Sequence, residues 1–192
     1  MSISVPKRSP EEFARLLHEL GSQSRPPVEN WQPTVEVEID MSINRRGEWI
    51  YNGKPIDRKA MVKLFASILI KEGPDAYFLV TPIEKARINV EDVPFVVTEL
   101  NQYCDDAGQV VVVFVTNTGD QIILNKDHGL RIFNDVQTGE TIPYLQMDRG
   151  LEARIGRNVF YELVEMADHI EKSGKTELLL KSQGENFVLG LY

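Results

Sequence analysis

Short runs in which apolar and polar residues alternate make up most of this chain. Val35, Val37 and Ile39 alternate with acidic residues, which predicts a strand with one buried face and one acidic face. Residues 110–115 are apolar on both faces, so we expect a central strand that is covered on both sides. Turn residues separate further predicted strands at 77–81, 83–88, 95–100, 110–116, 121–124 and 129–133, weaker strands at 142–148 and 151–155, and a closing hairpin of 176–180 and 187–191.

Three runs have helical periodicity instead. Ser9 and Glu12 have the spacing of a capping box, and the apolar residues that follow predict a helix that ends at Gly21. Two longer helices are predicted at 58–71 and 158–172, because their apolar residues recur every three or four positions. Prolines and polar residues fill residues 22–33, which indicates a linker or a wrapped arm.

The second of the longer helical runs repeats the first together with its surroundings. Gly47 and Gly150 are 103 residues apart, as are Gly53 and Gly156, and the apolar positions of the two helices match at a separation of 102. This repeat predicts an α+β fold of two similar halves, each a mostly antiparallel sheet with one packed helix. The expected division of the chain is an N-terminal helix and linker arm at 1–34, a first α+β domain at 35–98 and a second at 99–192.

Composition narrows the classes of function. The 192 residues have a formal net charge of −8, which argues against a duplex-DNA binder, since such proteins present a basic face to the phosphates. The single cysteine, Cys104, excludes an intrachain disulfide scaffold. No apolar run reaches the roughly 20 residues of a membrane span, and the first residues lack the apolar region of a signal peptide, so we expect a cytoplasmic protein.

The densest group of charged residues lies in the tail of the first half, after the part that is repeated. Strand alternation places Thr81, Lys85 and Arg87 on one face, where a lysine and an arginine together can hold a phosphate or a carboxylate. Arginines elsewhere in the first half would extend such a pocket. The candidate ligand-binding residues are Arg46, Trp49, Tyr51, Arg58, Thr81, Glu84, Lys85, Arg87, Glu91 and Asp92.

Two interpretations of this cluster are open at the level of the sequence. In the first, Trp49 or Tyr51 stacks on the base of a nucleotide-like ligand, since an aromatic face accepts any base. In the second, the cluster is a solvated face on which Lys85 and Arg87 pair with neighbouring acids, while the two aromatic residues pack on the first helix.

The sequence holds no recognisable catalytic or metal constellation. The three histidines share no short ligand spacing, and Cys104 has acidic neighbours that disfavour a thiolate. The adjacent acids Glu91 and Asp92 would point to opposite faces of a strand, so they offer one carboxylate to any one site. We therefore predict no catalytic residue, no metal ion and no cofactor.

Several longer motifs carry a resemblance to a known family. They are Ile39-Asp40-Met41-x-Ile43, Arg46-Gly47-x-Trp49-x-Tyr51-x-Gly53-x-Pro55-Ile56, Leu64-Phe65-Ala66-Ser67, Tyr77-Phe78-Leu79-Val80-Thr81-Pro82-x-Glu84-Lys85, Val90-Glu91-Asp92-x-Pro94-Phe95 and Val159-Phe160-Tyr161-Glu162-Leu163-Val164. Through them, residues 31–166 resemble the bacterial domain-of-unknown-function family numbered 1285. The resemblance implies a duplicated α+β core, a C-terminal half similar to a pleckstrin-homology fold, a nucleic-acid-like or nucleotide-like ligand bound between the halves, and a link to signalling.

Two stretches depart from the family pattern. Arg45-Arg46-Gly47 stands where an arginine-aspartate-glycine turn is usual, and residues 178–192 match poorly. A role for that aspartate in the family therefore does not transfer to this chain.

These observations predict a non-enzymatic cytoplasmic binding module that takes a small anionic or nucleotide-like ligand between its two halves. One alternative is a protein–protein adaptor without a small ligand, since an exposed strand edge can accept a partner segment. Another is an enzyme that acts on a phosphorylated substrate, with Glu84, Glu91 or Asp92 as the acid or base.

Overall fold

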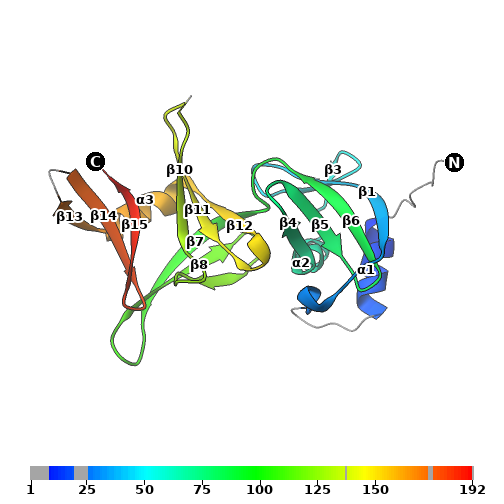
Figure 1. The fold of residues 1–192 in the computed structure, drawn as a ribbon, viewed down its shortest axis with the longest axis horizontal. Coiled ribbons are helices and arrows are strands. Elements are labelled where there is room, and N and C mark those ends of the chain that lie inside the picture. Colours follow the sequence, from blue (N-terminus) through cyan, green and yellow to red (C-terminus); the bar gives the residue numbers. More distant parts are fainter. Residues whose placement is uncertain (1–8, 20–25, 137, 173–174, 192) are drawn as a thin grey trace. The chain divides into compact units, whose positions relative to one another are not determined.

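The computed structural model describes residues 9–19, 26–136, 138–172 and 175–191 (Figure 1). The chain divides into two compact units, Met1–Pro94 and Phe95–Tyr192. Each unit contains a mixed six-stranded sheet, and the second unit adds a separate sheet of three strands. The predicted α+β fold of two similar halves is confirmed. No described helix is both long and apolar enough to cross a bilayer.

The N-terminal unit contains one sheet whose strands alternate in burial where the sequence alternates. Its described elements are α1 (Pro10–Glu19), the 3-10 helix η1 (Val28–Asn30), β1 (Val35–Ile43), β2 (Trp49–Tyr51), β3 (Lys54–Pro55), α2 (Lys59–Ser67), β4 (Leu69–Glu72), β5 (Ala76–Val80) and β6 (Glu84–Val90). The strand order is β3-β2-β1-β6-β5-β4, with β1 and β6 parallel and the other neighbours antiparallel. Along β1, Val37, Ile39 and Met41 are buried and the acids between them are exposed, as predicted.

Helix α1 begins with the predicted capping box. The Glu12 amide donates to Ser9 Oγ at 3.2 Å, and the Ser9 amide donates to Glu12 Oε2 at 2.8 Å. This reciprocal arrangement satisfies two amide groups at the start of the helix. Gly21, which was predicted to end the helix, lies outside the described residues.

The C-terminal unit contains two sheets. Its described elements are β7 (Phe95–Cys104), β8 (Val110–Thr116), β9 (Gln121–Ile123), β10 (Leu130–Asn134), β11 (Thr141–Gln146), the 3-10 helix η2 (Asp148–Gly150), β12 (Glu152–Ile155), α3 (Arg157–Met166), β13 (Asp168–Lys172), β14 (Lys175–Ser182) and β15 (Glu185–Leu191). The sheets have the orders β10-β11-β12-β7-β8-β9 and β13-β14-β15, and only β12 and β7 are parallel among the described pairs. The predicted domain boundary after residue 98 falls inside β7, which belongs to this unit.

Strand β8 is the apolar strand that the sequence predicts. Val112 and Phe114 are fully buried and Val113 is 8% exposed, so both faces are covered. The strand is interior but not central, because it lies between β7 and the edge strand β9.

Both longer helices end earlier than predicted, and a strand replaces the last part of each run. α2 ends at Ser67, whose Oγ donates to the carbonyl of Leu64 at 2.7 Å, and β4 begins at Leu69. α3 ends at Met166, and β13 begins two residues later. The apolar run that begins at Ile68 fits both a helical and an extended pattern, and its pairing with β5, where Ile70 lies opposite Phe78, selects the extended one.

The sequence repeat corresponds to a shared order of elements. In each unit a hairpin precedes a helix, and three antiparallel strands follow: the N-terminal meander (β4-β5-β6) after α2 and the C-terminal meander (β13-β14-β15) after α3. Gly47 and Gly150 both have positive φ, 73° and 70°. The second matched pair differs, because Gly53 has φ 73° in the β2–β3 turn whereas Gly156 is the N-cap of α3 with φ −61°. The repeat therefore extends to the elements but not to every matched residue.

Candidate functional site

The predicted charged face is present on β6, but its lysine is already paired. Lys85 and Arg87 share the face of β6 that points away from the core. The Lys85 ammonium lies 3.2 Å from Glu72 Oε2 and 3.6 Å from Glu36 Oε1, and it also lies 4.6 Å from the centre of the Phe78 ring. Two carboxylates and an aromatic face therefore compensate the charge of Lys85 before any ligand arrives.

Thr81 and Glu84 form a turn and do not share this face. Thr81 is 2% exposed, and its Oγ1 accepts the Glu84 amide at 2.9 Å and donates to the Glu84 carbonyl at 3.1 Å. Glu84 is itself 6% exposed. The prediction that Thr81 lies beside Lys85 and Arg87 is wrong, because the turn between β5 and β6 interrupts the strand alternation.

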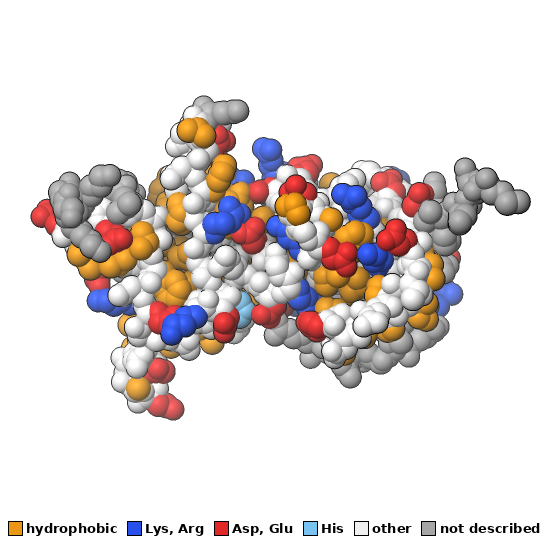
Figure 2. All heavy atoms as spheres, viewed as in Figure 1, with side chains coloured by type: hydrophobic (Ala, Val, Ile, Leu, Met, Phe, Trp, Pro, Cys, Tyr) orange, Lys and Arg blue, Asp and Glu red, His pale blue; other side chains and the backbone are white. Residues whose placement is uncertain are grey.

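The remaining charged candidates lie in turns or on the open sheet face. Arg46 lies 3.3 Å from Glu48 in the β1–β2 turn, and Glu91 Oε2 accepts the amide of Arg45 at 3.2 Å. Asp92 is half-buried after β6. Arg87 is exposed and has no ion-pair partner within the described residues. Figure 2 shows basic and acidic side chains interspersed on the visible face of this unit, which is typical of a solvated surface.

Trp49 is a core residue. It is 2% exposed and its ring lies 6.1 Å from that of Phe65 on α2, with 29° between the planes. Its Nε1 is buried without a hydrogen-bond partner in the described part of the chain. A ligand has no access to a ring in this position, so stacking on Trp49 is excluded for this conformation.

The structure brings two of the predicted residues, Tyr51 and Arg58, together in a groove of the N-terminal unit. The groove has a volume of about 670 Å³ and lies between the start of α1, the β2–β3 turn and the start of α2. Lys54 lies directly opposite Tyr51 in the β2–β3 pairing, and Arg58 is the N-cap residue of α2. This volume is within the range of small-molecule sites, roughly 300–1,000 Å³.

The walls of the groove offer three kinds of contact. Pro55, Ile56 and Met61 supply apolar surface, and Tyr51 supplies an aromatic ring that is half-buried. The side chains of Lys54 and Arg58 are exposed and have no ion-pair partner among the described residues.

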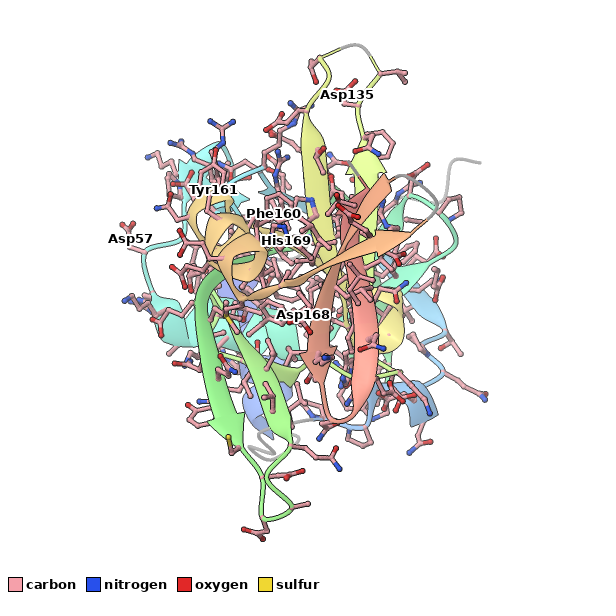
Figure 3. All side chains as sticks on the ribbon, turned by 90° about the vertical axis from the view of Figure 1, so that its left-hand side faces the viewer. Asp57, Asp135, Phe160, Tyr161, Asp168 and His169 are labelled. Atoms are coloured by element: carbon pink, nitrogen blue, oxygen red, sulfur yellow. The ribbon has the colours of Figure 1, made fainter. Side chains whose placement is uncertain are left out.

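Acidic groups also line the groove, namely Glu11 on α1 and Asp57 before α2. Figure 3 shows Asp57 on the outer side of its loop, and the residue is exposed. The groove is therefore of mixed charge, with two cations available for an anionic group and two acids available for a donor such as a hydroxyl or an amine.

Lys54 was missed by the sequence analysis although a signal for it was present. Asn52-Gly53 is a strong turn signal, and Asn52 and Gly53 do adopt positive φ of 46° and 73°. The residue directly after such a turn lies opposite the residue directly before it, so the turn at Asn52-Gly53 places Lys54 opposite Tyr51. Lys85 and Arg87, which the sequence analysis favoured, are not among the residues that line the groove.

The C-terminal unit contains polar pairs that link neighbouring elements. His128 Nε2 lies 3.0 Å from Asp148 Oδ1, and Arg131 forms two hydrogen bonds to Glu152, at 2.6 and 3.0 Å. The ammonium of Lys126 lies 2.7 Å from Glu185, and the hydrogen bond to that carboxylate raises the pKa of Lys126. Among the described residues, no group of three or more His, Cys, Asp or Glu side chains is arranged to hold a metal ion.

Comparison with known proteins assigns the family. The model of the DUF1285 N-terminal domain, a domain of unknown function, matches residues 26–93, and that of the DUF1285 C-terminal domain matches residues 94–189. The crystal structure of a DUF1285 family protein from Silicibacter pomeroyi has a TM-score of 0.82 and 37% identity, over 97% of this chain and 96% of that one.

A second solved structure, of a DUF1285 family protein from Shewanella baltica, has a TM-score of 0.53 and 29% identity, over 66% of this chain and 91% of that one. No curated protein matches the chain. Because both halves match in order and the fold agrees over nearly the whole chain, this protein belongs to the DUF1285 family.

Proposed function

We propose that the N-terminal unit is a ligand-binding module for a small anionic molecule with a planar ring, such as a nucleotide, and that the groove beside Tyr51 is its site. The observation that carries the proposal is the convergence of one aromatic ring and two unpaired cations on a groove of about 670 Å³. Such a combination suits a ligand that stacks on one side and carries a phosphate or carboxylate on the other.

Each residue has a distinct part in this proposal. Tyr51 stacks on the planar part of the ligand, and the guanidinium of Arg58 binds its anionic group through paired N–H donors. Lys54, across from Tyr51 in the hairpin, adds a second positive charge at the same end. Glu11 and Asp57 accept hydrogen bonds from ligand hydroxyl or amine groups, which favours a nucleotide over a simple inorganic anion. A signalling role, with occupancy of the groove as the input, is part of the same proposal.

A panel of nucleotides and simple anions tests this proposal by thermal shift and calorimetry on the full chain. A ligand at 100 times its dissociation constant is expected to stabilise the N-terminal unit by about 2.7 kcal/mol. Arg58→Ala is expected to weaken binding roughly 10- to 100-fold, which corresponds to the loss of a hydrogen bond to a charged group.

The matched control is Arg87→Ala, because Arg87 is an exposed arginine of the same unit that does not line the groove. The proposal requires Arg87→Ala to bind like the unmodified protein, while Lys54→Ala and Tyr51→Leu both weaken binding. If no member of the panel shifts the melting temperature, or if Arg87→Ala weakens binding as much as Arg58→Ala does, the groove is not the site.

A further inference from the structure

The C-terminal meander has an open edge at β13. β13 pairs with β14 on one side and is the outermost strand of its sheet in the described structure. Asp168, His169, Ile170 and Glu171 are all exposed, and Ile170 is 41% exposed. Figure 3 faces this part of the unit, with Asp168 and His169 labelled on β13 and Tyr161 labelled on α3. An unpaired strand edge of this kind is a template for pairing with another strand.

The corresponding edge strand of the N-terminal meander, β4, is less exposed. β4 begins with Leu69, which is fully buried, and only Glu72 of its four residues is exposed. Glu72 is also ion-paired with Lys85. Only one of the two related edges therefore presents a fully exposed strand.

The sequence of β13 is complementary to itself when two copies run antiparallel. With Ile170 opposite Ile170 of the second copy, His169 lies opposite Glu171. Asp168 is already paired within its own chain, because its Oδ2 lies 2.7 Å from the Lys181 ammonium, so His169 and Glu171 carry the complementarity. Neither the His169 nor the Glu171 side chain has a hydrogen-bond or ion-pair partner among the described residues. A histidine donates a hydrogen bond to a carboxylate when neutral and adds an ionic attraction when protonated.

This register is more favourable than the register shifted by one residue. A shift of one residue along the partner strand places His169 opposite a lysine and Ile170 opposite Glu171, which removes the His169–Glu171 pair and leaves an apolar side chain against a charge. The charge pattern thus favours one antiparallel register, as a symmetric contact between identical strands requires.

Apolar side chains and the acid Glu177 share the outer face of this sheet. Ile170 lies opposite Glu177 on β14, and Leu179 on the same face lies opposite Val188 on β15, which is 44% exposed. Leu178 and Leu180, which alternate with these residues along β14, are buried, so the exposed residues form the outer face of the sheet. A second sheet joined at β13 would continue this face across the contact.

We propose that two copies of this chain associate through β13, edge to edge and antiparallel, about a two-fold axis at Ile170. The two three-stranded sheets then form one sheet of six strands, in the order β15-β14-β13 followed by β13-β14-β15 of the second copy. Self-complementary charge is the reason to assign a second copy of this chain, and not a different peptide, to this edge. The contact is independent of the groove in the N-terminal unit.

Site-directed crosslinking tests the geometry. Ile170→Cys is introduced into a Cys104→Ser background, because Cys104 is exposed and would otherwise react. A short bis-maleimide reagent is expected to give a covalent dimer, because directly opposite residues of an antiparallel pair lie only about 5 Å apart. The control is Ile123→Cys in the same background, since Ile123 is an exposed isoleucine on β9, the edge of the other sheet of this unit.

Sedimentation equilibrium of the full chain tests the charge pattern. Glu171→Lys is expected to raise the dimer dissociation constant about tenfold, since two symmetry-related pairs lose the carboxylate that accepts a hydrogen bond from His169. The double variant His169→Glu with Glu171→Lys reverses both signs, restores complementarity and is expected to recover the dimer. A melting curve for each variant shows whether the meander is still folded.

The proposal is supported if position 170 crosslinks, position 123 does not, and the double variant recovers what Glu171→Lys loses. It is overturned if the protein sediments as a monomer up to millimolar concentration. It is equally overturned by a dimer that Glu171→Lys and Ile170→Lys leave unchanged, because such a dimer uses another surface.

Discussion

The two units differ in which strands complete the six-stranded sheet. In the N-terminal unit, the three strands that follow α2 join the sheet through the parallel pair of β1 and β6. In the C-terminal unit, β7 pairs in parallel with β12 instead. β7, β8 and β9 precede the hairpin in the chain and fill the positions that β6, β5 and β4 fill in the other unit. The meander that follows α3 is thereby left to form a sheet of its own. One sequence repeat can therefore end in two sheet arrangements when an additional set of strands occupies the pairing edge.

The two meanders are consequently held in different ways. The N-terminal meander is hydrogen-bonded into its sheet along β6. The C-terminal meander contacts the larger sheet of its unit through hydrogen bonds near the β14–β15 turn: the Val112 amide donates to Ser182 Oγ at 3.1 Å, and the Gln183 amide donates to the Val110 carbonyl at 2.8 Å. Buried leucines of β14 add apolar contact.

The largest expected effect comes from truncating the side chains that each helix buries. Phe65→Ala on α2 and Leu163→Ala on α3 each remove a fully buried side chain, at a cost of about 2–5 kcal/mol in the free energy of unfolding. Both tryptophans, Trp31 and Trp49, belong to the N-terminal unit, so tryptophan fluorescence reports on that unit. We expect Phe65→Ala to lower the fluorescence midpoint in urea and Leu163→Ala to leave it unchanged, with circular dichroism recording both. Equal shifts of the fluorescence midpoint would show that the two units unfold as one.

A smaller loss of stability is expected when the contact between the C-terminal meander and the larger sheet of its unit is weakened. Ser182 is fully buried, and Ser182→Ala leaves the Val112 amide without its acceptor, at a cost of about 1–3 kcal/mol. Hydrogen exchange measured residue by residue should show faster exchange in β13, β14 and β15 of the variant, and no change in β4, β5 and β6. Uniform acceleration throughout the chain would contradict a local role for Ser182.

Gly53 and Gly156 match in the sequence repeat but differ in backbone conformation, so a substitution at Gly53 should strain the backbone of the N-terminal unit. Gly53 has φ 73°, a conformation that costs an L-residue about 1–2 kcal/mol, so Gly53→Ala should lower the stability of the N-terminal unit by that amount. Gly53→Asn is the control, because asparagine tolerates positive φ better than alanine, and it should cost less. Chemical denaturation followed by fluorescence measures both variants, and an alanine variant as stable as the asparagine one would argue against strain at this turn.

The smallest effect is expected at the charged face that the sequence analysis favoured. Lys85→Met keeps the apolar stem over Phe78 but removes the ion pairs with Glu72 and Glu36, whose side chains are 49% and 73% exposed. Exposed pairs of this kind contribute about 0–1 kcal/mol. Thermal melts at low and high salt should therefore differ little between Lys85→Met and the unmodified protein. A loss well above 1 kcal/mol would mean that Lys85 stabilises the sheet more than its exposure suggests.

The features that could be predicted from sequence are those that depend on neighbouring residues. The capping box of Ser9 and Glu12 and the alternation along β1 each follow from local chemistry, and each is present in the structure. The ends of α2 and α3 could not be predicted, because apolar runs such as that around Ile68 fit a helix and a strand equally until a pairing strand is in place.

The candidate site could likewise be predicted only in part, because some of its contacts depend on residues that are distant in the sequence. Tyr51 and Arg58 were predicted from their residue types, and the structure places both at the groove. Trp49 was predicted by the same reasoning but packs on Phe65, because burial is decided by the position of α2 and not by the residue itself. Lys54 was overlooked because its relation to Tyr51 depends on the register of a two-residue strand.

The parallel strand pairs determine how long a loop of chain each unit must close during folding. Val35 pairs with Glu84 in the N-terminal unit and Phe95 with Ala153 in the C-terminal one, so the loops to be closed contain about 50 and 60 residues. Closure entropy grows only with the logarithm of loop length, and the two loops differ by no more than about 0.2 kcal/mol. Because such distant pairings dominate the contact order of small domains, the two units should fold at similar rates despite their different sheet arrangements.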